Sequence, residues 1–247
     1  TGLGNVAVGY RSLSSNTTAA SNTAIGVDAL TSNTTGTSNT AVGRDTLNQQ
    51  TTASYNTALG HQSLNLNTSG ASNTASGYKA LYANTTGTLN TAVGALAGDA
   101  ITTASYNTAL GYAALSANIT GAQNTAVGYA ALTLATGADN TAVGSQSLAN
   151  VAAGTYNTAL GRSAGHAVTT GANNTFIGGL TGDATTTASN NTAVGKSALS
   201  DNTTGDTLVA VGLNALATNT TAADNVAVGV NALYLTTTGA NNTAIGK

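Results

Sequence analysis

The chain of 247 residues contains no cysteine, proline, methionine, tryptophan or glutamate, and it has a single phenylalanine. Without cysteine it has no disulfides, no thiol nucleophile and no thiolate metal site. Charged residues make up 6% of the chain, whereas ordinary domains carry roughly 25%. The formal net charge of −2 gives no electrostatic signal for binding nucleic acid or an anionic membrane surface. No apolar run approaches the ~20 residues of a membrane span, so we expect no membrane insertion by this segment.

The biased composition still favours a regular fold. Disorder usually accompanies low hydrophobicity and high net charge, whereas 41% of this chain is hydrophobic and charge is scarce. No signal peptide is visible at the start. The chain begins and ends inside a repeat, and we therefore expect a segment of a longer fibre.

A five-residue box, Asn-Thr-Ala-Val-Gly, recurs along the whole chain. Its first position falls at residues 5, 22, 39, 56, 73, 90, 107, 124, 140, 157, 174, 191, 208, 225 and 242. Every spacing is 17 except one of 16, between Asn124 and Asn140. Numbered from the asparagine, the repeat reads N-T-A-V-G-Y-x-A-L-x-x-N-T-T-G-x-x. It predicts one continuous repeat domain over residues 1–247, with fourteen complete coils and partial ends.

The columns of the repeat predict strands. Position 2 is always Thr or Val, which are β-branched residues that suit a pleated strand. Thr, Asn and Gly are poor helix formers, and 17 residues are too few for a repeating pair of helices. We therefore expect an all-β fold, a β-solenoid or β-roll of 17-residue coils. The box should form a protected strand, and positions 12–14 a second one. Coils spaced ~4.8 Å apart would extend roughly 70 Å.

The distribution of charge predicts the outside of each coil. Charges occur at positions 6–7, 10–11 and 16–17 and never in the box, and unpaired charges are almost never fully buried. Arg44 and Lys79 should therefore be exposed. The large apolar side chains at positions 4 and 9 should be buried, and we expect this of Val93, Leu115, Val127 and Leu132. The 16-residue coil should show a shortened corner with the ladder intact.

Two columns of the box are candidate structural sites. Stacked asparagines at position 1 can form a hydrogen-bonded ladder, and an invariant glycine at position 5 suits a corner of positive φ or a close backbone approach. The ladder asparagines are Asn22, Asn39, Asn56, Asn73, Asn90, Asn107, Asn124 and Asn140. The corner glycines are Gly26, Gly43, Gly60, Gly77, Gly94 and Gly111.

The alternation of the box predicts association between chains. Asn, Ala and Gly share one face of the strand, and Thr and Val share the other. Two large apolar residues per coil make a thin core. We expect the small Asn/Ala/Gly face to admit a neighbouring chain, with cyclic symmetry and a homotrimer as the form.

The box resembles the head repeats of the YadA-like trimeric autotransporter adhesins, as in Asn5–Gly9, Asn22–Gly26 and Asn225–Gly229. The longer pattern is similar to bacteriophage tail-fibre and bacterial surface-fibre repeats. The resemblance covers the whole chain and implies a left-handed β-roll, a homotrimer and an extracellular place on a bacterial cell surface or phage virion fibre. The family's usual repeat is a little shorter than 17, and Thr mostly replaces Val at position 2.

Residues that could carry chemistry are few. His61 and His166 lie six repeats apart, about 30 Å at the expected rung spacing, so we expect no catalytic pair, no enzyme, no metal and no cofactor. Exposed tyrosines can contact a host surface, glycan or matrix ligand, or they can cover rung edges or pack between chains. The candidates for surface contact are Tyr55, Tyr106 and Tyr156 at position 17, and Tyr78, Tyr112 and Tyr129 at position 6.

The sequence thus favours a non-catalytic structural or adhesive fibre segment. An ice-binding β-solenoid is an alternative, on the threonine column at position 2. Adjacent pairs such as Thr17-Thr18, however, point to opposite faces and give no doubled array. A single-chain structural filament subunit is a further alternative.

Overall fold

A computed structural model describes residues 2–247, and it shows fifteen three-residue strands and no helix among them. The chain divides into one compact unit that ends at Gln123 and a second that begins at Asn124. The first unit contains β1 (Val6–Val8), β2 (Thr23–Ile25), β3 (Thr40–Val42), β4 (Thr57–Leu59), β5 (Thr74–Ser76), β6 (Thr91–Val93) and β7 (Thr108–Leu110). The second contains β8 (Thr125–Val127), β9 (Thr141–Val143), β10 (Thr158–Leu160), β11 (Thr175–Ile177), β12 (Thr192–Val194), β13 (Val209–Val211), β14 (Val226–Val228) and β15 (Thr243–Ile245).

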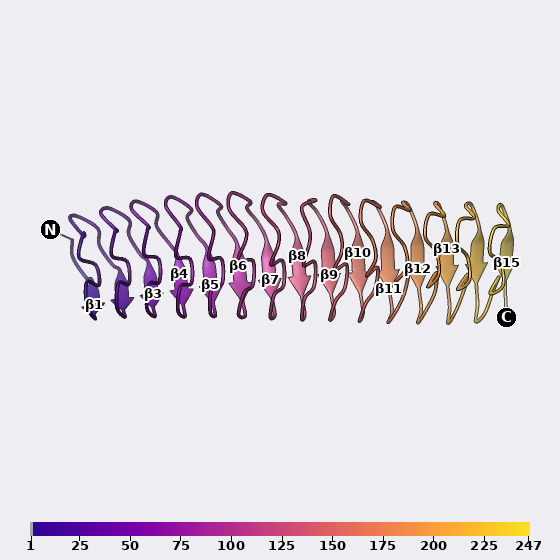
Figure 1. Ribbon diagram of the computed structural model, residues 1–247, viewed down its shortest axis with the longest axis horizontal. Coiled ribbons are helices and arrows are strands. Elements are labelled where there is room, and N and C mark those ends of the chain that lie inside the picture. Colours follow the sequence, from indigo (N-terminus) through magenta and orange to yellow (C-terminus); the bar gives the residue numbers. More distant parts are fainter. Residues whose placement is uncertain (1) are drawn as a thin grey trace. The chain divides into compact units, whose positions relative to one another are not determined.

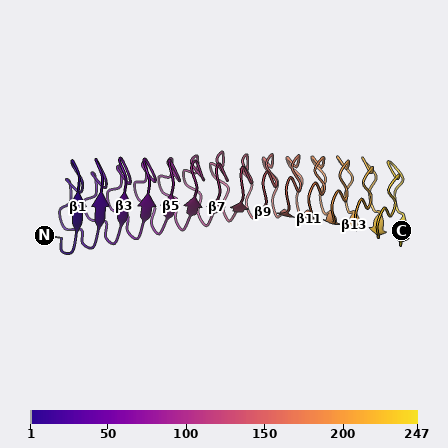
Figure 2. The ribbon, with the colours of Figure 1, turned by 90° about the horizontal axis from the view of Figure 1, so that it is seen from below.

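Within each unit, consecutive strands pair in parallel with a shift of one repeat. Thr40 lies opposite Thr57 and Ala41 opposite Ala58, and the same register holds for the other strand pairs within each unit. Figure 1 shows the strands of each unit side by side in chain order. Figure 2 shows the coils of each unit turned by 90°, with one strand in each coil. The predicted β-solenoid of 17-residue coils, one rung per repeat, is confirmed.

Each coil turns at four residues of positive φ. The glycine at position 5 has φ between 121° and 141°, outside the left-handed region that other residues adopt. A Cβ on Gly94 would lie 2.5 Å from the carbonyl oxygen of Gly111 on the next coil. This close approach explains why position 5 is always glycine. Positions 7, 9 and 17 are also left-handed, and their non-glycine residues have φ between 48° and 63°.

The interior of each coil is narrow and lies between the alanine of the strand and the leucine of position 9. The described leucines at position 9 are mostly fully buried, and Leu115 and Leu132 confirm the prediction for that column. The prediction for position 4 is wrong: Val93 is 37% exposed and Val127 is only half-buried. Alanine at position 3 fits opposite leucine, and the strand therefore turns its small face inward and its larger face outward.

Positions 12–14 do not form the second strand that the sequence predicts. They bend, and coils are joined there by bonds from position 13: the Thr34 N–H donates to the Thr51 carbonyl at 2.9 Å, and its hydroxyl donates to the same oxygen at 3.1 Å. The bend turns the side chain of position 12 into the coil.

The 16-residue coil has the predicted shortened corner. Where other coils have two residues at positions 13 and 14, this coil has only Thr136. The N–H and the hydroxyl of Thr136 each donate to the Ala152 carbonyl at 2.7 Å. The strand ladder continues from β8 to β9, with Thr125 opposite Thr141. The missing residue is absorbed entirely in the bend.

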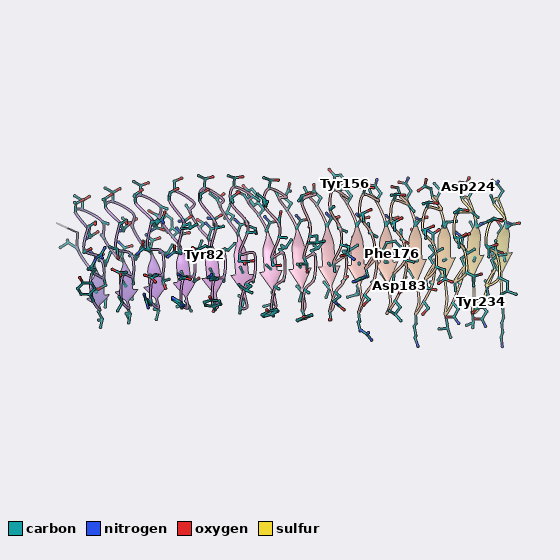
Figure 3. All side chains as sticks on the ribbon, in the orientation of Figure 1. Tyr82, Tyr156, Phe176, Asp183, Asp224 and Tyr234 are labelled. Carbon is teal, nitrogen blue, oxygen red and sulfur yellow. The ribbon has the colours of Figure 1, made fainter. Side chains whose placement is uncertain are left out.

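One part of the second unit departs from the usual interior. Phe176 occupies the alanine column and is fully buried, as labelled in Figure 3. Glycine replaces leucine at position 9 of the same coil and of the preceding coil. A Cβ on Gly182 would lie 2.4 Å from the ring of Phe176, and one on Gly165 would lie 2.8 Å from it. The two glycines thus make the space that the ring fills.

Candidate functional site

One surface feature recurs in every coil: the outward side of the strand, formed by the side chains of positions 2 and 4. Within each unit we call this surface the outer strand face. None of the strands within residues 2–247 contains a charged residue. Because the strands are in register, threonine and valine form one column and aliphatic side chains a second. Neighbouring rungs are about 4.8 Å apart, and the two columns about 6.6 Å. Exposed members of the aliphatic column away from the chain ends are Ile25, Leu59, Val93, Leu110, Leu160 and Ile177.

This arrangement corrects the expectation about the face left for a neighbouring chain. The alanines of position 3, such as Ala58 and Ala92, are fully buried inside their own coil. The small Asn/Ala/Gly face is therefore the core, and the surface offered to a partner is threonine and aliphatic. The alternation of side chains along the strand shows which residues share a face. The interior is narrow, and the face with the small side chains therefore points inward.

The asparagines of position 1 are buried and bonded from coil to coil. The Oδ1 atom of Asn22 accepts from the backbone N–H of Asn39 at 2.9 Å and from its Nδ2 at 3.1 Å. The Nδ2 of Asn39 also donates to the Ala53 carbonyl at 3.0 Å. All eight asparagines named from the sequence are buried. Their hydrogen bonds join the coils, and their side chains face away from solvent.

Position 12 forms a second polar column that sequence reasoning did not single out. The Asn84 Nδ2 donates to Asn67 Oδ1 at 2.8 Å, and the Asn67 Nδ2 donates to Gln50 Oε1 at 3.1 Å. Within its own coil, Asn67 also donates to the Gly70 carbonyl at 2.9 Å. The recurring Asn-Thr-Thr-Gly spacing was the available signal, because an amide three residues before the glycine reaches its carbonyl.

The tyrosines named from the sequence are exposed, but they belong to different edges of the coil. Tyr55, Tyr106 and Tyr156 lie at position 17 and have positive φ. In the second unit, Tyr156 and Asp224, both at position 17, lie at one edge (Figure 3). Asp183 and Tyr234, both at position 10, lie toward the other. Position 6, with Tyr78, Tyr112 and Tyr129, is also exposed.

Six side chains of positions 6, 7 and 10 gather on three consecutive coils of the first unit. We call them the 44–82 corner: Arg44, Asp45, His61, Tyr78, Lys79 and Tyr82. Asp45 Oδ2 lies 3.2 Å from Arg44 Nε and 3.8 Å from His61 Nε2. The His61 and Tyr78 ring centroids are 5.7 Å apart. Lys79 Nζ lies 5.5 Å from the Tyr78 ring centroid and 5.1 Å from that of Tyr82.

Two partly buried carboxyl groups lie elsewhere at position 10. Burial raises the pKa of Asp99 above its ordinary value, against its own backbone hydrogen bond and the charge of Lys79. Burial also raises the pKa of Asp183, and the Asp201 carboxylate adds to that rise while His166 opposes it. Within residues 2–247, no three His or Asp side chains are grouped so that they could hold a metal ion.

Across the described part of the chain there is no helix of the length and hydropathy that crossing a membrane requires. Comparison with protein-family models, with curated proteins and with solved structures gave no match.

Proposed function

We propose that the chain is a non-catalytic structural and adhesive segment of an extracellular fibre, carried on a bacterial cell surface or a phage virion. In this proposal three copies associate through their outer strand faces. Repetition supports a structural role, because coil after coil has the same three-residue strand and the same turns of positive φ. The resemblance of the box to YadA-like and tail-fibre repeats points the same way.

The observation that carries the proposal is the composition of the outer strand face. Each of its strands in the first unit presents Thr or Val at position 2 and, except for Ser76, an aliphatic side chain at position 4. Monomeric soluble proteins rarely expose contiguous apolar patches beyond about 300–600 Å². The face carries no charge that would repel an identical copy. Three copies around an axis parallel to the strand stack would bury it and leave no open edge for further growth.

Sedimentation velocity of the chain at micromolar concentration tests the proposal. We expect a trimer that becomes a folded monomer in the double variant Val93→Lys/Leu110→Lys, because lysines would bury charge between the faces. The control is Thr103→Lys/Thr120→Lys, which adds the same charge to exposed positions of the same two coils, away from the strands. A fully folded wild-type monomer would refute the trimer and favour a single-chain structural filament subunit.

Ice binding is the second candidate, and one observation favours it. The threonine pairs that point to opposite faces, such as Thr17-Thr18, lie at positions 13 and 14, whereas positions 2 and 4 point to the same side. They form a regular array of hydroxyl, methyl and aliphatic groups with a spacing of about 4.8 by 6.6 Å. A thermal-hysteresis assay decides between the candidates. Hysteresis in the wild type that disappears in Thr91→Lys would favour ice binding, and its absence in a trimeric sample would favour the fibre.

A further inference from the structure

The 44–82 corner is unusual in a chain with so little charge. Along the same edge of the first unit, the corresponding positions further on hold Ala95, Leu96, Tyr112 and Ala113. In the corner, by contrast, Arg44, His61 and Tyr78 follow one another at position 6 on successive coils. Cationic and aromatic side chains thus form a short track that advances by one rung, about 4.8 Å, per residue.

The backbone ladder holds this track in place. The Gln62 N–H donates to the Arg44 carbonyl at 3.0 Å, and the Lys79 N–H donates to the His61 carbonyl at 3.1 Å. Each member is therefore fixed one coil from the next by the same bonds that build the solenoid. The spacing of these side chains is thus fixed by the backbone, and no rearrangement of the backbone has to accompany binding, which favours recognition.

The charges of the corner are only partly neutralised within it. Arg44 Nε lies 3.2 Å from Asp45 Oδ2, and the Arg44 side chain is 70% exposed. The Lys79 ammonium lies near the rings of Tyr78 and Tyr82 and interacts electrostatically with the partly buried Asp99 carboxylate of the next coil. Two cations, Arg44 and Lys79, thus lie near two carboxylates: that of Asp45, whose side chain is 21% exposed, and the partly buried one of Asp99.

We propose that the 44–82 corner binds an acidic saccharide chain, with sugar rings against Tyr78 and Tyr82 and a uronate carboxylate between Arg44 and Lys79. A pyranose presents an apolar C–H face that stacks on an aromatic ring, and carboxylates form charge-assisted hydrogen bonds with guanidinium and ammonium groups. Nucleic acid is a poorer fit, because its binding needs many phosphate contacts and two cations supply few.

This inference rests on the proposed adhesive role, and it names the ligand class of that role. One exposed corner binds weakly by itself. Three copies in a trimer would present three corners to one polymer, and linkage of weak sites raises the overall affinity.

Titration calorimetry on the intact chain tests the site with two probes, hexagalacturonate and its fully methyl-esterified form. The ester keeps the sugar skeleton and removes the charge. We expect the acid to bind roughly tenfold more tightly than the ester. Lys79→Gln should reduce this preference, because only Arg44 then remains to bind the carboxylate, and Tyr78→Ala should weaken the binding of both probes. The matched control is Tyr112→Ala, which removes an exposed tyrosine from the same repeat position in a coil with alanine in place of the lysine.

Three outcomes would overturn the inference: equal binding of acid and ester, equal losses in Tyr78→Ala and Tyr112→Ala, or no binding by the wild type. Equal binding of a polyphosphate of the same charge would also overturn it, since it would show attraction to any polyanion. Sedimentation of the same samples separates this result from the assembly proposal. If the chain is a trimer and does not bind hexagalacturonate, the saccharide site is refuted and the trimer stands. If the chain is a monomer and binds hexagalacturonate, the trimer is refuted and the saccharide site stands.

Discussion

Two sets of coils build the same backbone around different interiors. The coils that begin at Asn56 and Asn73 have alanine at position 3, Leu64 and Leu81 at position 9, and an asparagine at position 12. The coils that begin at Asn157 and Asn174 have glycine at position 9 and valine or threonine at position 12, and the second of them has Phe176 at position 3. Yet β10 and β11 pair in the standard register.

The dihedral angles of the two sets agree as well. Leu64 has φ of 50°, and Gly165 and Gly182 have φ of 60° and 57°. The comparison shows that the hydrogen-bond ladder and the glycine of position 5 set the path of the backbone. The interior only has to be filled, and the bulk that fills it can come from position 3, 9 or 12. Gly98 and Ile101 repeat this exchange in the first unit, where a Cβ on Gly98 would lie 3.0 Å from Ile101 Cδ1.

Phe176→Ala should give the largest effect. It removes the ring from a space that Gly165 and Gly182 cannot fill, so we expect a loss of about 3–5 kcal/mol in the free energy of unfolding. Urea unfolding followed by circular dichroism measures it. Restoring leucine at both glycines in the same variant should recover most of the loss.

The reciprocal control is Ala58→Phe, in a coil with Leu64 and after one with Leu47. No glycine makes room there, and overpacking should cost about 1–3 kcal/mol or prevent folding. If Ala58→Phe were neutral, or if Phe176→Ala cost less than about 1 kcal/mol, the interior would not be filled by exchange of volume.

Leu64→Ala should give the next largest effect, about 2–4 kcal/mol of lost stability, because it opens a cavity in a fully buried column. Adding Asn67→Ile imitates the Gly98–Ile101 pair and should return part of the loss. Thermal unfolding of the single and double variants checks this. A double variant less stable than Leu64→Ala would show that the asparagine of position 12 contributes more through its hydrogen bonds than isoleucine does through volume.

The asparagine ladder can be broken in one coil and repaired in another. The Asn90 backbone N–H and its Nδ2 both donate to Asn73 Oδ1, and Asn73→Leu removes this acceptor. We expect the free energy of unfolding to fall by about 2 kcal/mol. Leu208 already interrupts the ladder, and Leu208→Asn would offer an acceptor to the Asn225 N–H. We expect that variant to gain about 1 kcal/mol. Hydrogen exchange at Asn90 and Asn225 gives the local readout, and protection that did not change at either amide would contradict the assignment.

The sequence predicts the period, the strand, the single rung per repeat and the burial of position 9, because each is visible in one column. It does not predict which strand face points inward, since a column of alanine suits either a narrow core or a close interface. The sequence also does not predict the left-handed φ of Leu64 and Tyr55, because neither residue type favours that conformation. The 44–82 corner depends on residues in different columns of successive coils, and reading each column by itself separates them.

The smallest expected effect concerns Asp99, which follows Gly98 in one of the coils with glycine at position 9. In two standard coils the same position holds an asparagine whose Nδ2 donates to a carbonyl of the preceding coil: Asn48 to Asp28 at 3.2 Å, and Asn65 to Asp45 at 2.7 Å. Asp99 Oδ1 has no hydrogen-bond partner, and burial raises the pKa of its carboxyl group. Asp99→Asn should therefore stabilise the protein at pH 7, by about 1 kcal/mol for the regained bond to the Lys79 carbonyl.

The pH dependence of that gain distinguishes the carboxylate from the hydrogen bond. A raised pKa means that the folded chain binds the Asp99 proton more tightly than the unfolded chain. The contribution of Asp99 to stability is therefore fully present below the ordinary value of 3.8 and is lost as the pH rises through the raised pKa. Thermal unfolding across this pH range should show that Asp99→Asn is more stable than the wild type. The difference in stability should be largest at pH 7 and smallest below pH 3.8. A gain that stayed constant with pH would mean that the hydrogen bond alone stabilises the variant.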